Sequence, residues 1–463
     1  MILIEGSWVL TENGDGKYLL NPGYVGIRGN KITYIGKNLP RGYENAKLIK
    51  VSNGLILPGF IDLHYHTDTP ITKGFIEDVG SPAFYGSALY EYLTAIYAAT
   101  TVDEWIPIAK LSLAEMIKNG ITTCVEFNSY FPEELASLLV EMGIRGYIAP
   151  ETNSLKGYPY SSDGKTIIIE EIDEAHAFDK LNANLNLIEK LNGTNNDMIR
   201  VTLGPTEPPA CKPELLREVR KYADIFKVPI TMHAAETLLE INRIKEKYDK
   251  TPIEYLDSYG ITGSDVILGH VIFTNYTDLQ ILARTRTNVA HCPMVFARRG
   301  NYLKSLQQYL SMGINVGIGT DTFPQDMIEE MRLASICSKI ADKNFKSAPS
   351  ETVFNCATSN GSKALGRDDI GSIKVGNKAD IIVVDLNDIN MVPTRDPIKV
   401  LVNCGVGQNV STTIVNGKIL MYNRKLTVSE ENVVADAKRA AKIIWKRVKN
   451  LDKLSPLSVP LIK

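Results

Sequence analysis

Eight short apolar runs alternate with helical patterns from about residue 55 to residue 366. The runs are GLILPGFIDLHYH, GITTCVEFNSY, GIRGYIAPETN, MIRVTLGPTEP, VPITMHAAE, VILGHVIF, TNVAHCPM and INVGIGTDT. Between them, stretches such as DEWIPIAKLSLAEMIKNG carry apolar residues at the 3.6-residue spacing of a helix. Buried strands that alternate with helices indicate a parallel sheet, and eight is the number that closes a (β/α)8 barrel. We therefore predict an α/β fold with a TIM-like barrel over residues 55–370.

The two flanks of this region have a different pattern. Residues 1 to about 54 and 371 to about 427 contain short strand patterns separated by turn signals such as NGDG, RGNK and SNG. Each flank has too few strands to bury a core alone. We predict that both chain ends combine into one small β-sandwich domain.

The remaining residues, 428–463, are predicted to form a C-terminal helix and tail. The helix should run from Glu430 to about Asn450 and dock on the barrel or on a neighbouring subunit. Its expected apolar face consists of Val434, Ala441, Ile444, Trp445 and Val448.

Composition excludes several classes of function. The net charge of −2 over 463 residues argues against a surface for nucleic acid, which needs a basic excess. No run of about 18 apolar residues predicts a membrane span. The start, MILIEGSWVLTENGDG, lacks the pattern of a signal peptide, so we expect a cytoplasmic protein. The six cysteines contain no C-x-x-C pair, which favours buried thiols over a disulfide framework or a cysteine zinc site.

The histidines cluster at one place in the predicted barrel. Five of the six lie at or near the carboxyl ends of predicted strands, and so does one aspartate: His64, His66, His233, His270, His291 and Asp321. Side chains at positions i and i+2 of a strand point the same way, so the first two histidines can face one cation. Active sites of this fold gather at that edge. Three imidazoles and a carboxylate form a ligand set suited to Zn²⁺ or Fe²⁺, with room for a water.

A carboxylate stands close to these candidate ligands. Glu236 lies three residues after His233, where it can face the same pocket without being a ligand. A divalent ion lowers the pKa of a bound water from 15.7 toward about 7. A carboxylate beside it can then transfer a proton to the atom that leaves or becomes basic.

Together these motifs resemble those of the amidohydrolase superfamily. PGFIDLHYH, His233 with Glu236, LGH at 268–270, HCP at 291–293 and GTD at 319–321 occur in the family's order. The best match is the mononuclear aminohydrolase branch, which includes guanine deaminase, adenosine-type deaminases and triazine hydrolases. The resemblance covers nearly the whole chain, including the split β-domain.

The resemblance implies a role for each matching residue. The implied metal ligands are His64, His66, His233 and Asp321. Glu236 corresponds to the family's proton-shuttling glutamate, His270 to its water-orienting histidine, and Asp321 also takes part in catalysis. We expect one divalent ion per chain, Zn²⁺ first and Fe²⁺ second, a small heterocyclic substrate, and a homo-oligomer (dimer or higher).

The sequence departs from the family at the substrate end of the pocket. Related nucleoside deaminases carry a histidine after Gly-Pro in the fourth strand, where this chain has Thr206 and Glu207. Many relatives continue HCP with Ser-Asn, whereas here the sequence is HCPMVFARRG. Thr206, Glu207, His291 and Arg298 are therefore our candidate substrate contacts, and the identity of the substrate does not transfer.

The predicted reaction is hydrolytic removal of an exocyclic amino group from a purine, pterin, pyrimidine or triazine. Halide displacement on a triazine could use the same site, although that branch can dispense with the acid that Glu236 supplies. Cyclic-amide hydrolysis usually needs a bridging lysine on the fourth strand, and MIRVTLGPTEP has none. A non-enzymatic scaffold is disfavoured because every ligand is present.

Several polar or aromatic residues have structural interpretations. His176, in DEAHAFDK, is expected on an exposed helix face, and Cys124 and Cys292 as buried thiols. Asp62 could hydrogen bond to a ligand histidine or serve strand packing, and the same holds for Asp68. Trp105 is expected in the core.

Overall fold

The computed structural model describes residues 1–13, 16–74, 96–157, 170–171, 174–301 and 305–451. A ring of parallel strands forms its centre. One sheet contains β6 (Phe60–Tyr65), β7 (Ile121–Ser129), β8 (Arg145–Thr152), β11 (Ile199–Val201) and β12 (Gly204–Pro205). The other contains β13 (Ile230–Ala234), β14 (Val266–His270), β15 (Asn288–His291) and β16 (Val316–Ile318). Parallel bridges from Leu203 to Ile230 and from Tyr65 to Asp321 join the two sheets at both edges.

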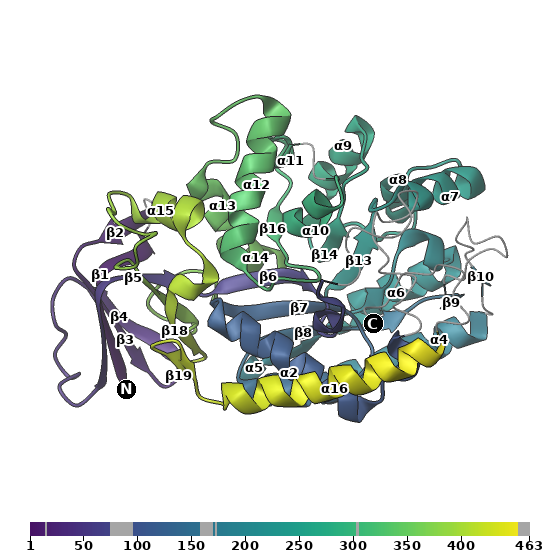
Figure 1. The fold of residues 1–463 in the computed structure, drawn as a ribbon. Helices are drawn as coiled ribbons and strands as arrows, with labels where there is room; N and C mark the ends of the chain where they lie inside the picture. Colours follow the sequence, from purple (N-terminus) through teal and green to yellow (C-terminus); the bar gives the residue numbers. More distant parts are fainter. Residues whose placement is uncertain (14–15, 75–95, 158–169, 172–173, 302–304, 452–463) are drawn as a thin grey trace.

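Helices follow the strands and cover the outside of this ring (Figure 1). They are α2 (Val102–Lys118), α3 (Pro132–Met142), α4 (Glu174–Leu191), α6 (Pro213–Phe226), α7 (Leu238–Tyr248), α8 (Pro252–Ser258), α9 (Tyr276–Thr285), α10 (Pro293–Arg298), α11 (Leu306–Ser311), α12 (Met327–Asp342), α13 (Ser350–Cys356) and α14 (Ser359–Ala364). As expected, Trp105 is buried on α2 and His176 is exposed on α4. A short α5 (Thr194–Asp197) and a two-stranded sheet of β9 (Leu155–Gly157) and β10 (Glu170–Glu171) complete this part.

Strands from both ends of the chain form one sheet of nine strands. They are β1 (Ile2–Asn13), β2 (Gly16–Leu20), β3 (Gly23–Arg28), β4 (Lys31–Gly36), β5 (Lys47–Pro58), β17 (Ile381–Asp385), β18 (Val410–Val415), β19 (Lys418–Tyr422) and β20 (Lys425–Leu426). The antiparallel pair of β5 and β17 joins the two flanks, and buried side chains such as Ile4, Ile56 and Val383 fill its core.

The first apolar run does not form one strand. Residues up to Pro58 belong to β5 and pair with β17, whereas the run after Gly59 is β6 and pairs with β7. Gly59 lies where a Cβ would come within 2.1 Å of the Thr122 side chain, so the chain can turn there only without a side chain. The nine-stranded sheet consequently extends past residue 54, the end of the predicted N-terminal flank.

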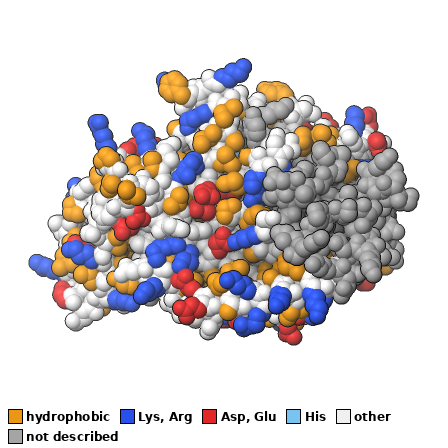
Figure 2. All heavy atoms as spheres, in the orientation of Figure 1, with side chains coloured by type: hydrophobic (Ala, Val, Ile, Leu, Met, Phe, Trp, Pro, Cys, Tyr) orange, Lys and Arg blue, Asp and Glu red, His pale blue; other side chains and the backbone are white. Residues whose placement is uncertain are grey.

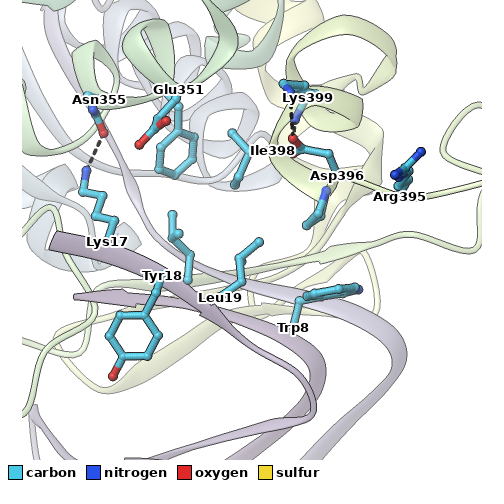
Figure 3. Close-up of a pocket in the computed structure, with 13 residues that line it drawn as sticks. Trp8, Lys17, Tyr18, Leu19, Glu351, Asn355, Arg395, Asp396, Ile398 and Lys399 are labelled. Carbon is cyan, nitrogen blue, oxygen red and sulfur yellow. Dashed lines mark hydrogen bonds and ion pairs between the residues drawn. The ribbon is translucent and has the colours of Figure 1, made fainter. Parts of the chain in front are cut away.

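A cavity of about 840 Å³ separates the nine-stranded sheet from α13 and α15 (Pro397–Cys404) (Figure 3). Trp8 and Leu19 face it from the sheet, and Ile398 faces it from α15. Lys17 crosses one end and donates a hydrogen bond to Asn355 Oδ1. The sheet thus contacts the helices of the ring through side chains as well as through the shared backbone.

The C-terminal helix, α16 (Glu430–Leu451), lies along α2 (Figure 1). Its buried positions are Val433, Ala437, Ala440, Ile444 and Val448. The predicted face was therefore wrong at Val434, which is 40% exposed, because the helical period that contains Ile444 and Val448 passes through Val433. The predicted tail, 452–463, lies outside the described residues.

No helix in the described part of the chain is long and apolar enough to cross a membrane. On the described part of the face in Figure 2, acidic and basic side chains are interspersed. This distribution agrees with the small net charge.

Candidate active site

Three histidines and one aspartate meet at the carboxyl ends of the ring strands. His64 lies in β6, His66 directly follows it, and His233 lies in β13. One ligand atom from each of these histidines lies within 4.8 Å of the other two. Asp321, just beyond β16, places Oδ1 3.8 Å from His64 Nε2 and 3.7 Å from His66 Nε2. The fold thus brings together all four residues predicted as metal ligands.

Backbone carbonyls determine which ring nitrogen faces the centre. His66 Nδ1 lies 2.9 Å from the Phe127 carbonyl, and His233 Nδ1 lies 3.1 Å from the Thr206 carbonyl. A carbonyl only accepts, so each Nδ1 carries a proton and each Nε2 is left facing the centre. The two Nε2 atoms are 3.3 Å apart. Where both Nε2 atoms are unprotonated, their lone pairs repel each other at that separation, and a cation between them removes the repulsion.

The donor set fits a divalent ion. His64 is fully buried, and neither of its ring nitrogens has a hydrogen-bond partner in the described structure. Donor atoms that share a zinc ion at about 2.0–2.1 Å lie roughly 3 to 4 Å from one another, and the separations found here are 3.3, 3.7 and 3.8 Å. Burial lowers the pKa of His233 to about 3, and burial with the neighbouring histidines holds the pKa of His64 well below its ordinary value. Both rings are therefore neutral, the form that binds metals.

Asp62 fixes the backbone on both sides of this cluster. Its carboxylate accepts hydrogen bonds from His64 N at 3.2 Å, Thr320 N at 3.1 Å and Thr320 Oγ1 at 2.6 Å. Burial raises the pKa of Asp62 to about 7. Of the two interpretations open for Asp62, the structure shows hydrogen bonding to the histidine's backbone, which orients His64 and Asp321 together.

Glu236 and His270 form a second pair beside the ligands. His270 Nε2 lies 3.3 Å from Glu236 Oε1 and 4.0 Å from Asp321 Oδ2. Burial and the charges of Asp321 and Glu240 raise the pKa of Glu236 well above its ordinary value. Burial and the neighbouring histidines lower the pKa of His270 well below its ordinary value. At neutral pH this pair offers a carboxyl that can hold a proton and an uncharged imidazole.

Cys292 also lies near this pair. Its sulfur, with ligand atoms of His64, His270 and Asp321, belongs to a second group within 4.8 Å. The side chain is fully buried, the thiol donates to the Ala290 carbonyl, and burial raises its pKa well above the ordinary value. A protonated thiol is a poor ligand, so the buried-thiol interpretation agrees with the structure.

The candidate substrate contacts have different surroundings. The Thr206 carbonyl accepts a hydrogen bond from His233 Nδ1. The buried Thr206 hydroxyl has no hydrogen-bond partner among the described residues. Burial raises the pKa of Glu207 to about 8. His291 is 3% exposed, and burial lowers its pKa to about 3. Substrate binding by these three residues stays a prediction.

The neighbouring residues Arg298 and Arg299 have different surroundings. Arg298 donates to the Phe323 carbonyl at 2.7 Å and to Thr322 Oγ1 at 3.1 Å, so it supports the segment that follows Asp321. The positive charge of Arg299 instead lies near Glu236 and His270. It opposes part of the rise that burial causes in the pKa of Glu236, and it adds to the lowering of the pKa of His270. Of the two arginines only Arg298 was predicted as a substrate contact, whereas the fold brings the charge of Arg299 near Glu236 and His270.

Residues 55–420 match the sequence model of the amidohydrolase family. The chain belongs to this family. The match includes every predicted ligand as well as Glu236 and His270, and the predicted family membership is confirmed. Members of this family have a fold of the TIM-barrel type, in agreement with the ring described above.

Two relatives carry the names of deaminases. The 5-methylthioadenosine/S-adenosylhomocysteine deaminase of Thermococcus onnurineus (strain NA1) is 34% identical over 404 residues, 86% of this chain and 90% of the relative. The 5'-deoxyadenosine deaminase of Methanosphaera stadtmanae is 32% identical over 449 residues, 95% of this chain and 98% of the relative. Both names agree with the predicted deamination of a heterocycle.

A solved structure shows the same fold over nearly the whole length. The adenosine deaminase from Xanthomonas campestris, crystallised with bound zinc, has a TM-score of 0.83 and 22% identity. The alignment covers 96% of this chain and 98% of that one. At this level of identity the likeness shows the fold, and the metal belongs to the relative.

Proposed function

We propose that this chain is a metal-dependent aminohydrolase that deaminates an adenine-type nucleoside. The observation that carries the proposal is the pair of facing Nε2 atoms of His66 and His233 beside Asp321, with Glu236 3.3 Å from His270. The deaminase names of relatives that match along most of their length support the substrate class.

His64, His66, His233 and Asp321 would hold one divalent ion, with Zn²⁺ preferred and Fe²⁺ second. The bound ion would supply Lewis-acid activation of water at neutral pH. One ion is proposed because the fourth-strand sequence offers no lysine to bridge a second.

The protein's own residues would then manage protons and orientation. Glu236 would accept a proton from the attacking water and pass it to the ring nitrogen next to the amine-bearing carbon, and later pass the second proton of that water to the departing amine. Its raised pKa suits the role, because a carboxyl that holds a proton at neutral pH can donate one. His270 and Asp321 would orient the attacking water toward the ring carbon. Because Thr206 stands where nucleoside deaminases carry a histidine, we propose that Thr206, Glu207 and His291 define the substrate end of the pocket.

Product analysis tests the proposal. Zinc-loaded protein would be incubated with 5'-deoxyadenosine, 5'-methylthioadenosine, S-adenosylhomocysteine, guanine and a chlorotriazine, and ammonia and chloride would be measured. We expect ammonia from at least one adenine nucleoside and none after metal removal by a chelator. Chloride from the triazine without ammonia from any adenine nucleoside would overturn the proposal in favour of a halide-displacing hydrolase.

The domain organisation is also a proposal. We propose the predicted organisation with its first boundary moved to the end of β5: a (β/α)8 barrel up to residue 370, a composite β-sandwich domain from the residues up to Pro58 and 371–427, and a separate C-terminal segment, 428–463. Support comes from the nine-stranded sheet, which contains strands from both flanks, and from the side-chain contacts across the cavity in Figure 3.

We further propose that the chain forms a homo-oligomer. The support is an exposed apolar strip on and just after α12, where Ile336, Ile340 and Phe345 are 44%, 62% and 80% exposed. Light scattering should give at least a dimer for the wild type and a smaller species for Ile340→Glu. A monomeric wild type would contradict this proposal. The cytoplasmic location stays a prediction.

A further inference from the structure

Glu236 lies in the turn between β13 and α7, and a side chain from the first turn of α7 fixes the backbone of this turn. Thr237 caps α7, and its Oγ1 accepts a hydrogen bond from Glu240 N at 3.1 Å. In the common capping box, a glutamate at this third position bonds back to the N–H of the cap residue. Here the Glu240 carboxylate reaches further, to Ala235 N and Glu236 N, at 2.7 Å each. One buried side chain therefore fixes two successive peptide units directly at Glu236.

The backbone at this point needs such a restraint. Ala235 has φ of 51°, in the left-handed region that residues other than glycine rarely occupy. Its carbonyl accepts from Ile272 N at 2.9 Å and from Phe273 N at 2.8 Å. Both polar groups of Ala235 are thus used, the N–H by Glu240 and the carbonyl by the segment that follows His270.

These bonds connect the two residues of the proton-transferring pair. The segment with the Ile272 and Phe273 donors begins at His270, which itself has φ of 72°. The peptide unit between Ala235 and Glu236 is therefore tied to the segment that follows His270, and the side chains of Glu236 and His270 meet at 3.3 Å. If the Glu240 bonds were lost, Ala235 could relax toward an ordinary conformation and carry the Glu236 side chain away from His270.

We propose that Glu240 is a positioning residue for Glu236. Its carboxylate accepts hydrogen bonds from the backbone N–H groups of Ala235 and Glu236, and it acts by holding the peptide unit that aims the Glu236 carboxyl. The inference rests on the proposed function, because Glu236 must be the proton-transferring group for its aim to affect the rate.

Glu240→Gln is the most informative variant because the amide keeps the shape and one acceptor oxygen, while its NH₂ group faces a backbone donor. We expect kcat for ammonia release to fall about 10- to 100-fold, the cost of a misplaced catalytic group. KM should change less than about threefold and metal content should stay at the wild-type level, because neither substrate binding nor the ligands depend on this bond. Glu240→Ala removes both acceptors and should lower kcat further. Glu246→Gln, on the exposed side of the same helix, is the matched control and should leave kcat unchanged.

A double-mutant cycle separates positioning from a purely structural role. With Glu236 already replaced by Gln, adding Glu240→Gln should change the remaining rate less than about twofold, because the group that Glu240 aims is gone. An equal loss of rate in both backgrounds, or a Glu240→Gln protein with wild-type kcat, would overturn the inference. A zinc-loaded wild type that releases no ammonia from any adenine nucleoside would instead overturn the proposed function. The two failures are distinguished because the second is seen before any variant is made.

Discussion

Two clusters of buried polar groups differ in how their hydrogen-bonding needs are met. One lies at the junction of the ring with the nine-stranded sheet, and the other lies at the carboxyl ends of the ring strands, here called the catalytic edge. At the junction, the fully buried Arg145 guanidinium donates from Nε and Nη2 to Asp380 at 3.2 and 3.1 Å. Its Nη1 donates to the Asp197 carbonyl at 2.6 Å, and Asp380 also accepts from Asn416 N at 2.6 Å. The chain itself supplies the partners that these charges need.

At the catalytic edge the chain leaves polar atoms without such partners. The ring nitrogens of His64 are buried and have no hydrogen-bond partner among the described residues, and the Nε2 atoms of His66 and His233 face each other at 3.3 Å. Leaving these atoms unpaired costs stability, and a bound cation would recover that cost. The junction cluster is satisfied within the chain, whereas the histidine cluster would be satisfied by the proposed metal ion.

Removing a proposed ligand at the catalytic edge should have the largest effect on metal content and activity. His233→Ala should reduce bound metal to below about a tenth of an equivalent per chain and abolish deamination, because one of four donors is lost. Elemental analysis and ammonia release would measure both. A variant that keeps a full equivalent of metal would remove His233 from the ligand set, and two essential ions in the wild type would contradict the single-ion proposal.

Glu236→Gln should instead lower the rate of deamination and leave metal binding unchanged. The amide keeps the shape but cannot transfer a proton, so kcat should fall about 10²- to 10⁴-fold, roughly 3 to 5 kcal/mol of barrier. Metal content should match the wild type. Loss of metal would mean that Glu236 is a ligand, and near-wild-type deamination would refute its role as the acid.

At the junction, Arg145→Met should affect folding and not chemistry. It leaves the Asp380 carboxylate buried without its charge partner, which should cost about 3 to 5 kcal/mol of unfolding free energy. In metal-loaded folded protein, kcat should be unchanged. The double variant with Asp380→Leu should recover part of the loss in denaturant titrations. Arg145→Met with wild-type stability would show that the ring and the nine-stranded sheet are not coupled through this pair.

Asp62→Asn should give the smallest effect, because Asp62 is a satisfied carboxyl at the edge of the unsatisfied cluster. The amide retains an acceptor oxygen for His64 N but loses one charged acceptor near Thr320. We expect a loss of about 1 to 2 kcal/mol in unfolding free energy and a modest weakening of metal binding, measured by competition with a chelator. A loss of metal as complete as in His233→Ala would place Asp62 among the ligands.

Much of the architecture could be predicted from local pattern. The alternation of apolar runs with helical spacing predicted the parallel strands, and the position of each histidine within its run placed it at the catalytic edge. The failures were local as well. The first run divides at Gly59, because Pro58 and Phe60 pair with different sheets. The face of α16 was misassigned at Val434, because Val433 and Val434 are both apolar and it is Val433 that packs into the main core, on the same helical face as Ile444 and Val448.

The sequence by itself determined the ligand types and their meeting place, because parallel strands that point the same way end at one edge, and residues at strand ends must gather there. It also determined that Glu236 lies three residues beyond a predicted ligand, His233. Only the tertiary structure decided which ring nitrogen each histidine presents, since that depends on the carbonyls of Phe127 and Thr206 from other strands. It likewise decided that the charge of Arg299 lies near Glu236, and that Asp380 satisfies Arg145 from 235 positions away. Such contacts join residues that are distant in sequence, and no periodicity in the chain records the direction in which a side chain finally points.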